Sequence, residues 1–280
     1  MQVIRSIGRM HSESRRLAAE GRTIGVVPTM GYLHRGHLSL MARAQKAADV
    51  VVATVFVNPA QFGPREDLSR YPRDEKGDIV KMREAGVGIA FIPRAEKMYP
   101  DEFQTFVTVD RLTQTLEGKH RPTHFRGVTT VVAKLFNIIR PDVAAFGMKD
   151  YQQAVVLRQM ARDLGYPIKF IVAPTVRERD GLAMSSRNRY FGPDERLEAR
   201  CLYYALRTAK AIVRAGERNP GTVRSEMRAV IRANCATAEI DYIAFTDFDT
   251  LKPVAEIHPG SVCSLAVQVH GVRLIDNTKL

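Results

Sequence analysis

The fold of this chain is decided by residues 23–47, which read TIGVVPTMGYLHRGHLSLMARAQKA. Ile24–Val27 is a short apolar run that predicts a buried strand, and Pro28 ends it because proline cannot donate to a sheet ladder. The spacing of the later apolar residues predicts a helix over His37–Ala47. A strand, a glycine turn and a helix in this order leave free backbone N–H groups at the positive end of a helix dipole. A phosphate binds readily at such a point.

The turn carries two histidines, His34 and His37, which are three residues apart and therefore lie on one side of a helical turn. Neutral imidazoles donate hydrogen bonds and titrate near neutral pH, which suits charge that builds up on a phosphorus centre. Gly36 lies between them and lets a flat ring approach the backbone. Taken alone, the pattern also fits a surface turn with two solvated histidines.

Strands alternate with helices as far as residue 173, which predicts an α/β fold with a doubly wound parallel sheet. Ligands bind at the carboxyl edge of such sheets, where the loop Asn58–Gly63 leaves its strand. We expect Phe103–Val109 to be an edge strand or hairpin, and 116–127 to be irregular. The expected strands are Ile24–Val27, Asp49–Val57, Val87–Ile92, Val143–Phe146 and Ile168–Ala173, and the expected helices are Arg9–Glu20, His37–Ala47, Asp74–Ala85, Val128–Ile139 and Tyr151–Leu164.

The pattern changes at Pro174, where a long polar loop begins. Helices are expected at Asp194–Ala215 and Thr222–Cys235, and short strands at Ile240–Thr246, Ser261–Val269 and Val272–Ile275. Helices followed by strands without alternation indicate a second, smaller α+β domain. We therefore expect one domain over residues 1–174 and another over residues 175–280.

The composition limits the partners of the chain. The formal net charge is +12, from 42 Lys and Arg against 30 Asp and Glu, which attracts anions. The basic residues are scattered without an aromatic–basic platform, so a nucleic-acid partner is not expected. No apolar run has membrane length and no signal-peptide core is present, which predicts a cytoplasmic protein without membrane contact.

The cysteines Cys201, Cys235 and Cys263 lack C-x-x-C spacing, which argues against a disulfide framework or a zinc site and favours packing as small apolar residues.

Two further segments carry groups that suit a phosphate. Lys149 follows the strand Val143–Phe146 as a point charge, and Asp150 can cap the next helix. The segment 184–188, MSSRN, combines two hydroxyls, an arginine and loop amides, which is the composition of a phosphate clamp. Each segment alone also fits an ordinary solvated surface.

Together the H-x-G-H turn and the M-S-S-R loop resemble the HIGH and KMSKS elements of the nucleotidyltransferase superfamily, which includes class I aminoacyl-tRNA synthetases. The resemblance narrows to the pantothenate synthetase (pantoate–β-alanine ligase) family, whose motifs occur here in the same order. They are PTMGYLHRGH, FVNPAQF, YPR, HFRGV, KLFNIIRPD, FGMKDYQQ, PTVRE and DGLAMSSRN. The match covers most of residues 28–188 and continues more loosely to the end. It implies a Rossmann-like, class I synthetase-like fold with a C-terminal lid domain.

The resemblance implies a reaction in two steps. The carboxylate of D-pantoate attacks the α-phosphorus of ATP, giving pantoyl adenylate and pyrophosphate, and the amine of β-alanine then displaces AMP to form pantothenate. Since a carboxylate resists an amine until it carries a good leaving group, the protein has to align the reactants and neutralise charge. The family also implies Mg²⁺, carried mainly by the ATP phosphates, and a homodimer.

The resemblance implies site residues at matching positions. His34 and His37 would stabilise the transition state at the α-phosphate, and Lys149 and Arg187 would join them as catalytic residues. Gln61 and Gln153 would bind pantoate with help from Arg126, and Asp78 is a weaker candidate for a Mg²⁺ contact. The implied ATP-binding residues are Met30, His34, Gly36, His37, Gly147, Lys149, Asp150, Val176, Met184, Ser185, Ser186 and Arg187.

Four positions depart from the family pattern: Tyr32, Arg35, Thr123 and Met148. Because Arg35 and Met148 stand where acids are usual, we expect a more positive nucleotide end without a change of reaction. Two other functions remain as alternatives. One is an adenylyltransferase that acts on a cofactor precursor and shares the H-x-G-H turn. The other is a non-catalytic RNA-binding module that uses the positive charge.

Overall fold

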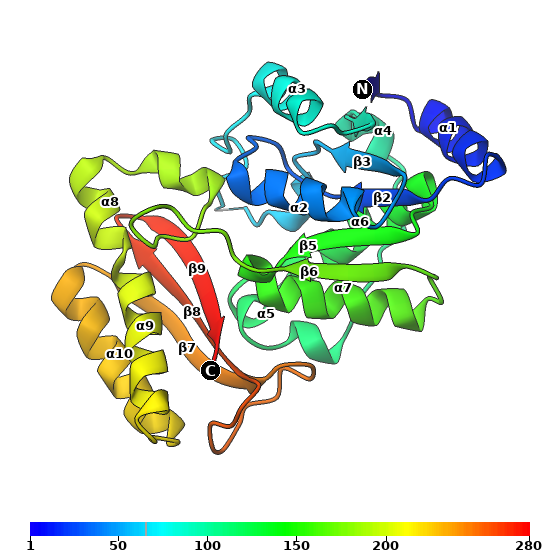
Figure 1. Cartoon of the computed structure of the whole chain (residues 1–280). Coiled ribbons are helices and arrows are strands. Elements are labelled where there is room, and N and C mark those ends of the chain that lie inside the picture. Colours follow the sequence, from blue (N-terminus) through cyan, green and yellow to red (C-terminus); the bar gives the residue numbers. More distant parts are fainter. Residues whose placement is uncertain (65) are drawn as a thin grey trace.

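The short apolar runs form the centre of a parallel sheet, as the sequence predicts. In this computed structural model, which describes residues 1–64 and 66–280, the larger sheet has six parallel strands in the order β1-β4-β3-β2-β5-β6 (Figure 1). Its strands are β1 (Gln2–Ile4), β2 (Ile24–Val27), β3 (Val50–Thr54), β4 (Ile89–Phe91), β5 (Val143–Gly147) and β6 (Lys169–Ala173).

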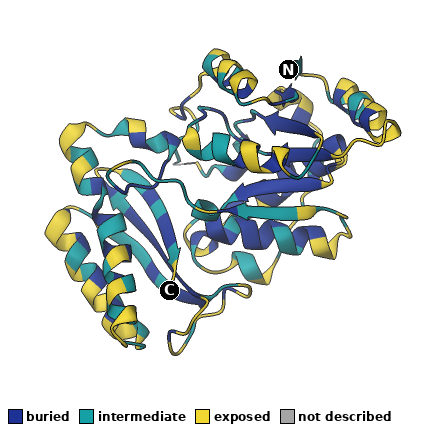
Figure 2. Cartoon of the chain, in the orientation of Figure 1, coloured by how far each residue is buried: buried dark blue, intermediate teal, exposed yellow. Residues whose placement is uncertain are grey.

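The central strands are buried on both faces, which explains their continuous apolar runs. Successive side chains of a strand point to opposite faces. Val26 and Val52 therefore pack into one core, and Val27 and Val51 pack into the other. The first core is covered by α1 (Ile7–Ala19), α6 (His124–Ile139) and α7 (Tyr151–Asp163), and the second by α2 (Arg35–Gln45) and α3 (Glu75–Glu84). Figure 2 shows these strands mostly dark, with the exposed residues gathered on the outer surfaces of the helices.

The described residues form these helices, which connect or flank the strands. The α-helices are α1 (Ile7–Ala19), α2 (Arg35–Gln45), α3 (Glu75–Glu84), α4 (Ala95–Met98), α5 (Glu117–His120), α6 (His124–Ile139), α7 (Tyr151–Asp163), α8 (Pro193–Ala199), α9 (Cys201–Arg214) and α10 (Pro220–Asn234). The 3₁₀ turns are η1 (Pro59–Gln61), η2 (Arg111–Thr113), η3 (Met148–Asp150) and η4 (Ser186–Tyr190).

The strand order reverses between β2 and β5, which lie side by side. From β2 the chain builds outward through β3 to β4, whereas β5 is followed by β6 on the other side. In doubly wound sheets, ligands bind at the carboxyl ends of the strands at this reversal. The turn after β2 carries His34 and His37, and the turn after β5 carries Lys149, so the fold brings these two motifs to one point.

The last third of the chain forms a separate sheet and core. The antiparallel strands β7 (Glu239–Asp247), β8 (Ser261–Val269) and β9 (Val272–Lys279) lie in sequence order, and α9 and α10 pack against them (Figure 1). This confirms the α/β class with a C-terminal α+β unit. The expected division at residues 174 and 175 stays a prediction; β6 ends at Ala173, just before it.

One strand expectation was wrong, and one strand was missed. Phe103–Val109 forms no strand within the described chain, because its backbone bonds to side chains of α6 instead of a sheet. Thr129 Oγ1 donates to the carbonyl of Val107, and Thr130 Oγ1 accepts from the N–H of Val107. The sequence analysis also missed β1, which has three residues and is too short for a periodic pattern.

Three element bounds also differ. The expected helix Asp194–Ala215 is two helices, α8 and α9, which meet at Arg200, and Ala199 and Cys201 on either side of this residue are both buried. The expected irregular segment 116–127 contains α5 and the start of α6. Strand β9 continues to Lys279. Among the described residues, no helix is long and apolar enough to span a membrane.

Candidate functional site

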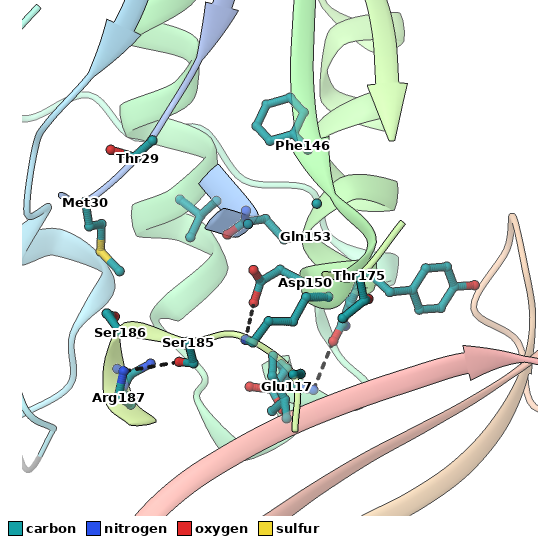
Figure 3. Close-up of a pocket in the computed structure, with 18 of the residues that line it drawn as sticks. Thr29, Met30, Glu117, Phe146, Asp150, Gln153, Thr175, Ser185, Ser186 and Arg187 are labelled. Atoms are coloured by element: carbon teal, nitrogen blue, oxygen red, sulfur yellow. Dashed lines mark hydrogen bonds and ion pairs between the residues drawn. The ribbon is translucent and has the colours of Figure 1, made fainter. Parts of the chain in front are cut away.

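A cavity of about 270 Å³ opens at the carboxyl ends of β2 and β5 and extends to the C-terminal sheet (Figure 3). It brings together residues separated by more than a hundred positions, from the histidine turn, η3 and the loop before α8. Of the residues that the sequence analysis selected, the cavity is lined by Met30, His34, Gly36, His37, Gln61, Gly147, Lys149, Asp150, Gln153, Val176, Met184, Ser185, Ser186 and Arg187.

The two histidines are stacked at the start of α2. His34 is the residue that caps the helix, and its ring centroid lies 4.0 Å from that of His37. Gly36 makes this stack possible, because a Cβ at that position would lie 2.8 Å from Cε1 of His34. The flat ring that approaches the backbone of Gly36 is therefore His34 itself.

Both imidazoles present the same nitrogen to a ligand. Nδ1 of His34 accepts from the N–H of Gly36 at 3.2 Å, and Nδ1 of His37 accepts from the N–H of His34 at 3.3 Å. An accepting nitrogen carries no proton, so each neutral ring holds its proton on Nε2. Two Nε2–H donors are thus left for a group in the cavity.

Burial keeps these rings neutral. It lowers the pKa of His34 to about 4, and the nearby charge of Lys149 adds to the effect. The pKa of His37 lies well below its usual value for the same reason, with further contributions from His34 and Lys149. At neutral pH the pair therefore donates hydrogen bonds as uncharged rings, and Lys149 and Arg187 are among the residues that bring positive charge to the cavity.

Lys149 enters the cavity from η3, a turn that the C-terminal sheet holds in place. Its Nζ lies 3.4 Å from Oδ1 of Asp150. The side-chain amide of Asn277, on β9, donates to the carbonyls of Met148 and Lys149 at 2.8 and 2.9 Å. The backbone that carries the lysine is therefore anchored by the other unit of the chain.

The serine–arginine loop reaches the cavity from the opposite side. Ser185 Oγ accepts from the N–H of Arg187, and the hydroxyls of Ser186 and Tyr71 are 3.0 Å apart. Asp67 orients the guanidinium through two hydrogen bonds of 2.9 and 2.7 Å. Burial alone would raise the pKa of Asp67, but the hydrogen bonds and the charge of Arg187 hold this pKa below its usual range. The ion pair is therefore charged at neutral pH. Figure 3 shows Ser185, Ser186 and Arg187 together, across from Asp150 and Gln153.

Comparison with known proteins identifies this arrangement. The sequence profile of pantoate-beta-alanine ligase matches residues 2–279. The pantothenate synthetase of Moorella thermoacetica is 50% identical over 280 residues, which cover 100% of this chain and 99% of the relative. The crystal structure of pantothenate synthetase from Thermus thermophilus is 44% identical, with a TM-score of 0.95 over 100% of this chain and 99% of that one. The chain belongs to the pantoate–β-alanine ligase family.

A further solved structure that is similar to this chain has ligands bound. The pantoate–β-alanine ligase from Francisella tularensis, complexed with β,γ-ATP and β-alanine, is 32% identical, with a TM-score of 0.83 over 100% of this chain and 97% of that chain. As a family member, this chain is an AMP-forming ligase that makes pantothenate from pantoate and β-alanine at the expense of ATP.

The ligase cavity contains both glutamines that the sequence analysis assigned to pantoate. Gln61 is buried; its Oε1 accepts from Asn58 at 3.1 Å, and its Nε2 lies 3.1 Å from the sulfur of Met30. The turn η1 that holds Gln61 packs against α6 at Gly127. A Cβ at Gly127 would lie 2.2 Å from the carbonyl oxygen of Ala60, so this close approach requires glycine.

Two assigned residues lie elsewhere. Arg126 is exposed, and its guanidinium lies 4.6 Å from the centre of the Phe106 ring, outside the cavity lining. This placement argues against a direct contact with pantoate. Asp78 is buried, and its two carboxylate oxygens accept from the N–H groups of Tyr32 and Leu33, both at 2.7 Å. This placement argues against a direct Mg²⁺ contact, because the carboxylate fixes the turn that leads into His34.

Met148, one of the four departures from the ligase pattern, lies outside the cavity lining. Met148 packs with Tyr151 and Phe248 beneath the C-terminal sheet instead of lining the cavity. Its effect on the charge of the nucleotide end is therefore indirect. Arg35 is exposed at the start of α2 and is not among the residues that line the cavity, so the expected effect on the charge of the nucleotide end stays a prediction.

The sequence analysis missed a polar group at the far end of the ligase cavity. The buried Glu117 accepts from Arg273 at 2.6 and 2.8 Å and from the hydroxyl of Tyr242 at 2.9 Å. Because Glu117 belongs to α5 and the other two belong to β9 and β7, this group joins the two units. His124, which also lines the cavity, was seen only as part of an irregular segment. An isolated charge in a sequence gives no signal of such a pairing.

Proposed function

We propose that this cavity performs both chemical steps on one set of groups. In the first, the carboxylate of pantoate attacks the α-phosphorus of ATP, which forms pantoyl adenylate and releases pyrophosphate. In the second, the amine of β-alanine attacks the acyl carbon and releases AMP. The observation that carries the proposal is the convergence of the stacked His34 and His37 with Lys149 and the loop Ser185–Arg187 on a single cavity.

The neutral imidazoles suit the first step. Each holds an Nε2–H donor, and attack by a carboxylate adds negative charge to the α-phosphate oxygens. Donors that are already fixed in place stabilise that charge without reorganising. His34 is fixed by the N–H of Gly36 and by its stack on His37, so both rings are held in position by the protein.

The cations suit the leaving group. Lys149 and Arg187, with the hydroxyls of Ser185 and Ser186, would hold the triphosphate and then the pyrophosphate. Met30, Gly36, Gly147, Asp150, Val176 and Met184 would line the nucleotide. The phosphate end of the cavity carries cations and few carboxylates, so the described residues form no cage for a resident metal ion there. We therefore take the substrate to be ATP with Mg²⁺ bound to its phosphates.

The glutamines suit pantoate, whose hydroxyls require neutral donors and acceptors. Gln61 and Gln153 both line the cavity, one from η1 and the other from α7. We also propose a homodimer, a cytoplasmic location and movement of residues 175–280 as a lid about Pro174. The homodimer and the cytoplasmic location rest on the family and on the sequence. The lid movement is supported by Arg187 and Asn277, which belong to residues 175–280 and reach the cavity.

The test supplies ATP, Mg²⁺, D-pantoate and β-alanine and measures AMP by mass spectrometry. His37→Ala should lower the rate about 10² to 10³-fold, because one donor to the transition state is lost. His258→Ala, at an exposed position outside the cavity, is the matched control. Pyrophosphate exchange should require pantoate and should not occur with phosphopantetheine. A His37→Ala enzyme as active as the control would contradict the assignment.

The lid and the dimer need separate measurements. Light scattering on the purified chain measures its mass, and a monomer at micromolar concentration would contradict the dimer. Small-angle scattering with and without an ATP analogue tests the lid, since closure of residues 175–280 should reduce the radius of gyration. An unchanged radius would contradict the movement.

A further inference from the structure

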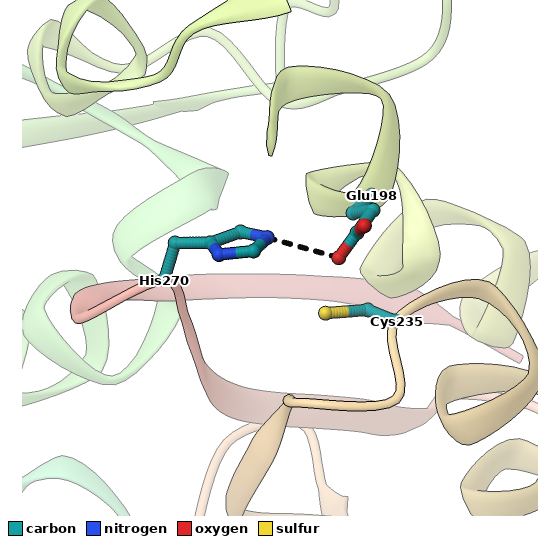
Figure 4. Close-up of side chains that lie close together, drawn as sticks. All are labelled: Glu198, Cys235 and His270. Carbon is teal, nitrogen blue, oxygen red and sulfur yellow. Dashed lines mark hydrogen bonds and ion pairs between the residues drawn. The ribbon is translucent and has the colours of Figure 1, made fainter. Parts of the chain in front are cut away.

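A second cluster of chemically active side chains lies in the C-terminal unit, away from the ligase cavity. Glu198 near the end of α8, Cys235 just after α10 and His270 in the turn between β8 and β9 point toward one another (Figure 4). One donor atom from each lies within 4.8 Å of the other two. None of the three lines the ligase cavity.

We propose that Glu198, Cys235 and His270 bind a Zn²⁺ ion. Carboxylate, thiolate and imidazole are the side-chain ligands that zinc takes in proteins, and a thiolate beside an imidazole disfavours hard ions such as Mg²⁺. The charges also balance: the carboxylate and the thiolate neutralise the two positive charges of the ion, and the imidazole binds as a neutral ligand.

The geometry requires only small movements. For a tetrahedral zinc ion, the usual bond lengths place nitrogen, oxygen and sulfur ligands about 3.3 to 3.7 Å apart. Nε2 of His270 and Oε2 of Glu198 are already 2.9 Å apart in a direct hydrogen bond, so the ion would enter by separating them slightly. The thiol of Cys235 has a weak polar partner, the hydroxyl of Thr237 at 3.6 Å.

The turn at the end of the hairpin directs the imidazole toward the other two groups. His270 and Gly271 both have positive φ, 47° and 74°, as a two-residue hairpin turn of this kind requires. Histidine is among the residues other than glycine that adopt a positive φ more often than most. The ring thereby lies beside Glu198, which belongs to a helix 72 residues earlier in the chain.

The burial of the three groups leaves a place for a fourth ligand. Cys235 is 2% exposed, whereas the side chains of His270 and Glu198 are 28% and 40% exposed. A water molecule can therefore complete the tetrahedron from the solvent side. On binding, the S–H bond of Cys235 breaks, a bond from sulfur to zinc forms, and the proton passes to solvent. Nε2 of His270 also binds the ion, and its proton is replaced by one on Nδ1 through exchange with solvent, so the ring stays neutral.

Such an ion would cross-link three segments of the C-terminal unit. The end of α8, the end of α10 and the β8–β9 turn are far apart in sequence, and the ion binds them only when they are folded together. Metal binding therefore stabilises the folded state. We assign the site a structural role, because it lies outside the cavity where ATP reacts.

The test uses the whole chain, stripped of metal with a chelator and titrated with Co²⁺ in the absence of nucleotide. Cobalt bound to a thiolate gives a charge-transfer absorption in the near ultraviolet, which nitrogen and oxygen ligands alone do not give. We expect one Co²⁺ per chain with this band, displaced by stoichiometric Zn²⁺, and a higher midpoint of thermal unfolding with Zn²⁺.

Two variants and a control decide the outcome. Cys235→Ser should abolish the band. His270→Asn removes the imidazole but keeps a residue suited to the positive φ of the turn, and it should weaken metal binding by more than about tenfold. Cys263→Ala removes another buried cysteine of the same unit and should leave both band and affinity unchanged. Absence of the band in the parent protein, or its survival in Cys235→Ser, would overturn the proposal. AMP formation by His270→Asn at saturating substrate should match the parent in either case.

Discussion

Gly36 controls the shape of the reactive pair. It has no side chain, and the ring of His34 occupies the space where a Cβ would be. The stack between His34 and His37, and the hydrogen bond from the N–H of Gly36 that sets the tautomer of His34, both depend on this approach. One missing methyl group therefore decides which imidazole nitrogens face the substrate.

A Gly36→Ala substitution should separate activity from stability. Alanine favours a helix over glycine by up to about 1 kcal/mol, so the free energy of unfolding should stay the same or rise. The displaced His34 ring should lower the rate of AMP formation at least about tenfold. Gly8→Ala is the control, because an added Cβ in α1 meets only Oγ of Ser6 at 3.9 Å. Full activity with Gly36→Ala would show that the stack is dispensable.

The buried histidines also predict how stability depends on pH. Burial lowers the pKa of both His34 and His124 to about 4, with Lys149 and Arg121 adding to the effect. The unfolded rings titrate near about 6.5. Between these values the unfolded chain binds more protons, so the contribution to stability is present above about pH 6.5 and is lost as the pH falls toward 4.

Urea unfolding at several pH values in this window measures the effect. The free energy of unfolding should fall between about pH 6.5 and 4, and His124→Gln should make that decline shallower, because glutamine does not titrate. Carboxylates with lowered pKa values, such as Asp67, add to the loss only toward the acid end of the window. Equal slopes for the parent and the variant would contradict the role of His124.

At the scale of the elements, the histidine turn is held by α3, which comes after β3 in the chain. Asp78, in the first turn of α3, accepts from two successive backbone N–H groups just before His34. Tyr32 has a φ of 52°, a conformation that favours glycine. The carboxylate stabilises that conformation by binding the N–H of Tyr32 itself, so α3 positions α2 through one side chain.

Asp78→Asn distinguishes this structural role from metal binding. An amide replaces one of the two accepting oxygens by a donor, so a buried backbone N–H loses its partner. We expect a loss of about 1 to 3 kcal/mol in the free energy of unfolding, measured in urea. The Mg²⁺ concentration that gives half the maximal rate of AMP formation should not change. An altered Mg²⁺ dependence with unchanged stability would instead indicate a contact with the metal ion.

At the scale of the whole molecule, the two units share the site. The first contributes the histidines and Lys149, and the second contributes Ser185–Arg187 and the anchor Asn277. The ion pair of Glu117 with Arg273 joins the units at the other end of the cavity. The C-terminal unit therefore both covers the cavity and sets the position of a residue that belongs to the first.

Asn277→Ala should weaken ATP binding. The substitution leaves the carbonyls of Met148 and Lys149 without their donor and frees the turn that carries the lysine. We expect the KM for ATP to rise about tenfold, which corresponds to about 1.4 kcal/mol. The KM for β-alanine should change less. Thr278→Ala, one position further along β9, is the matched control. Equal effects on both substrates would indicate a general loosening of the fold.

Most of the fold could be predicted from local patterns. Short apolar runs that alternate with amphipathic segments specify a parallel sheet, because every such strand is buried on both faces. The H-x-G-H turn, Lys149 and the serine–arginine loop could be found because the residues that give each segment its chemistry are close together in the sequence. Phe103–Val109 misled the analysis, since its alternation matched a strand, yet its hydrogen-bond partners belong to α6.

The sequence by itself determined the sheet, the motifs that meet at its carboxyl edge and the family of the chain. Only the tertiary structure decided how these motifs are held. Asn277 anchors the turn that carries Lys149, Asp78 binds the histidine turn, and Glu117 pairs with Arg273. It also brought Cys235 beside His270 and Glu198, although the spacing of the cysteines had argued against a metal. The physical reason is the same each time, because these contacts join residues tens to more than a hundred positions apart, and only the folded chain brings them together.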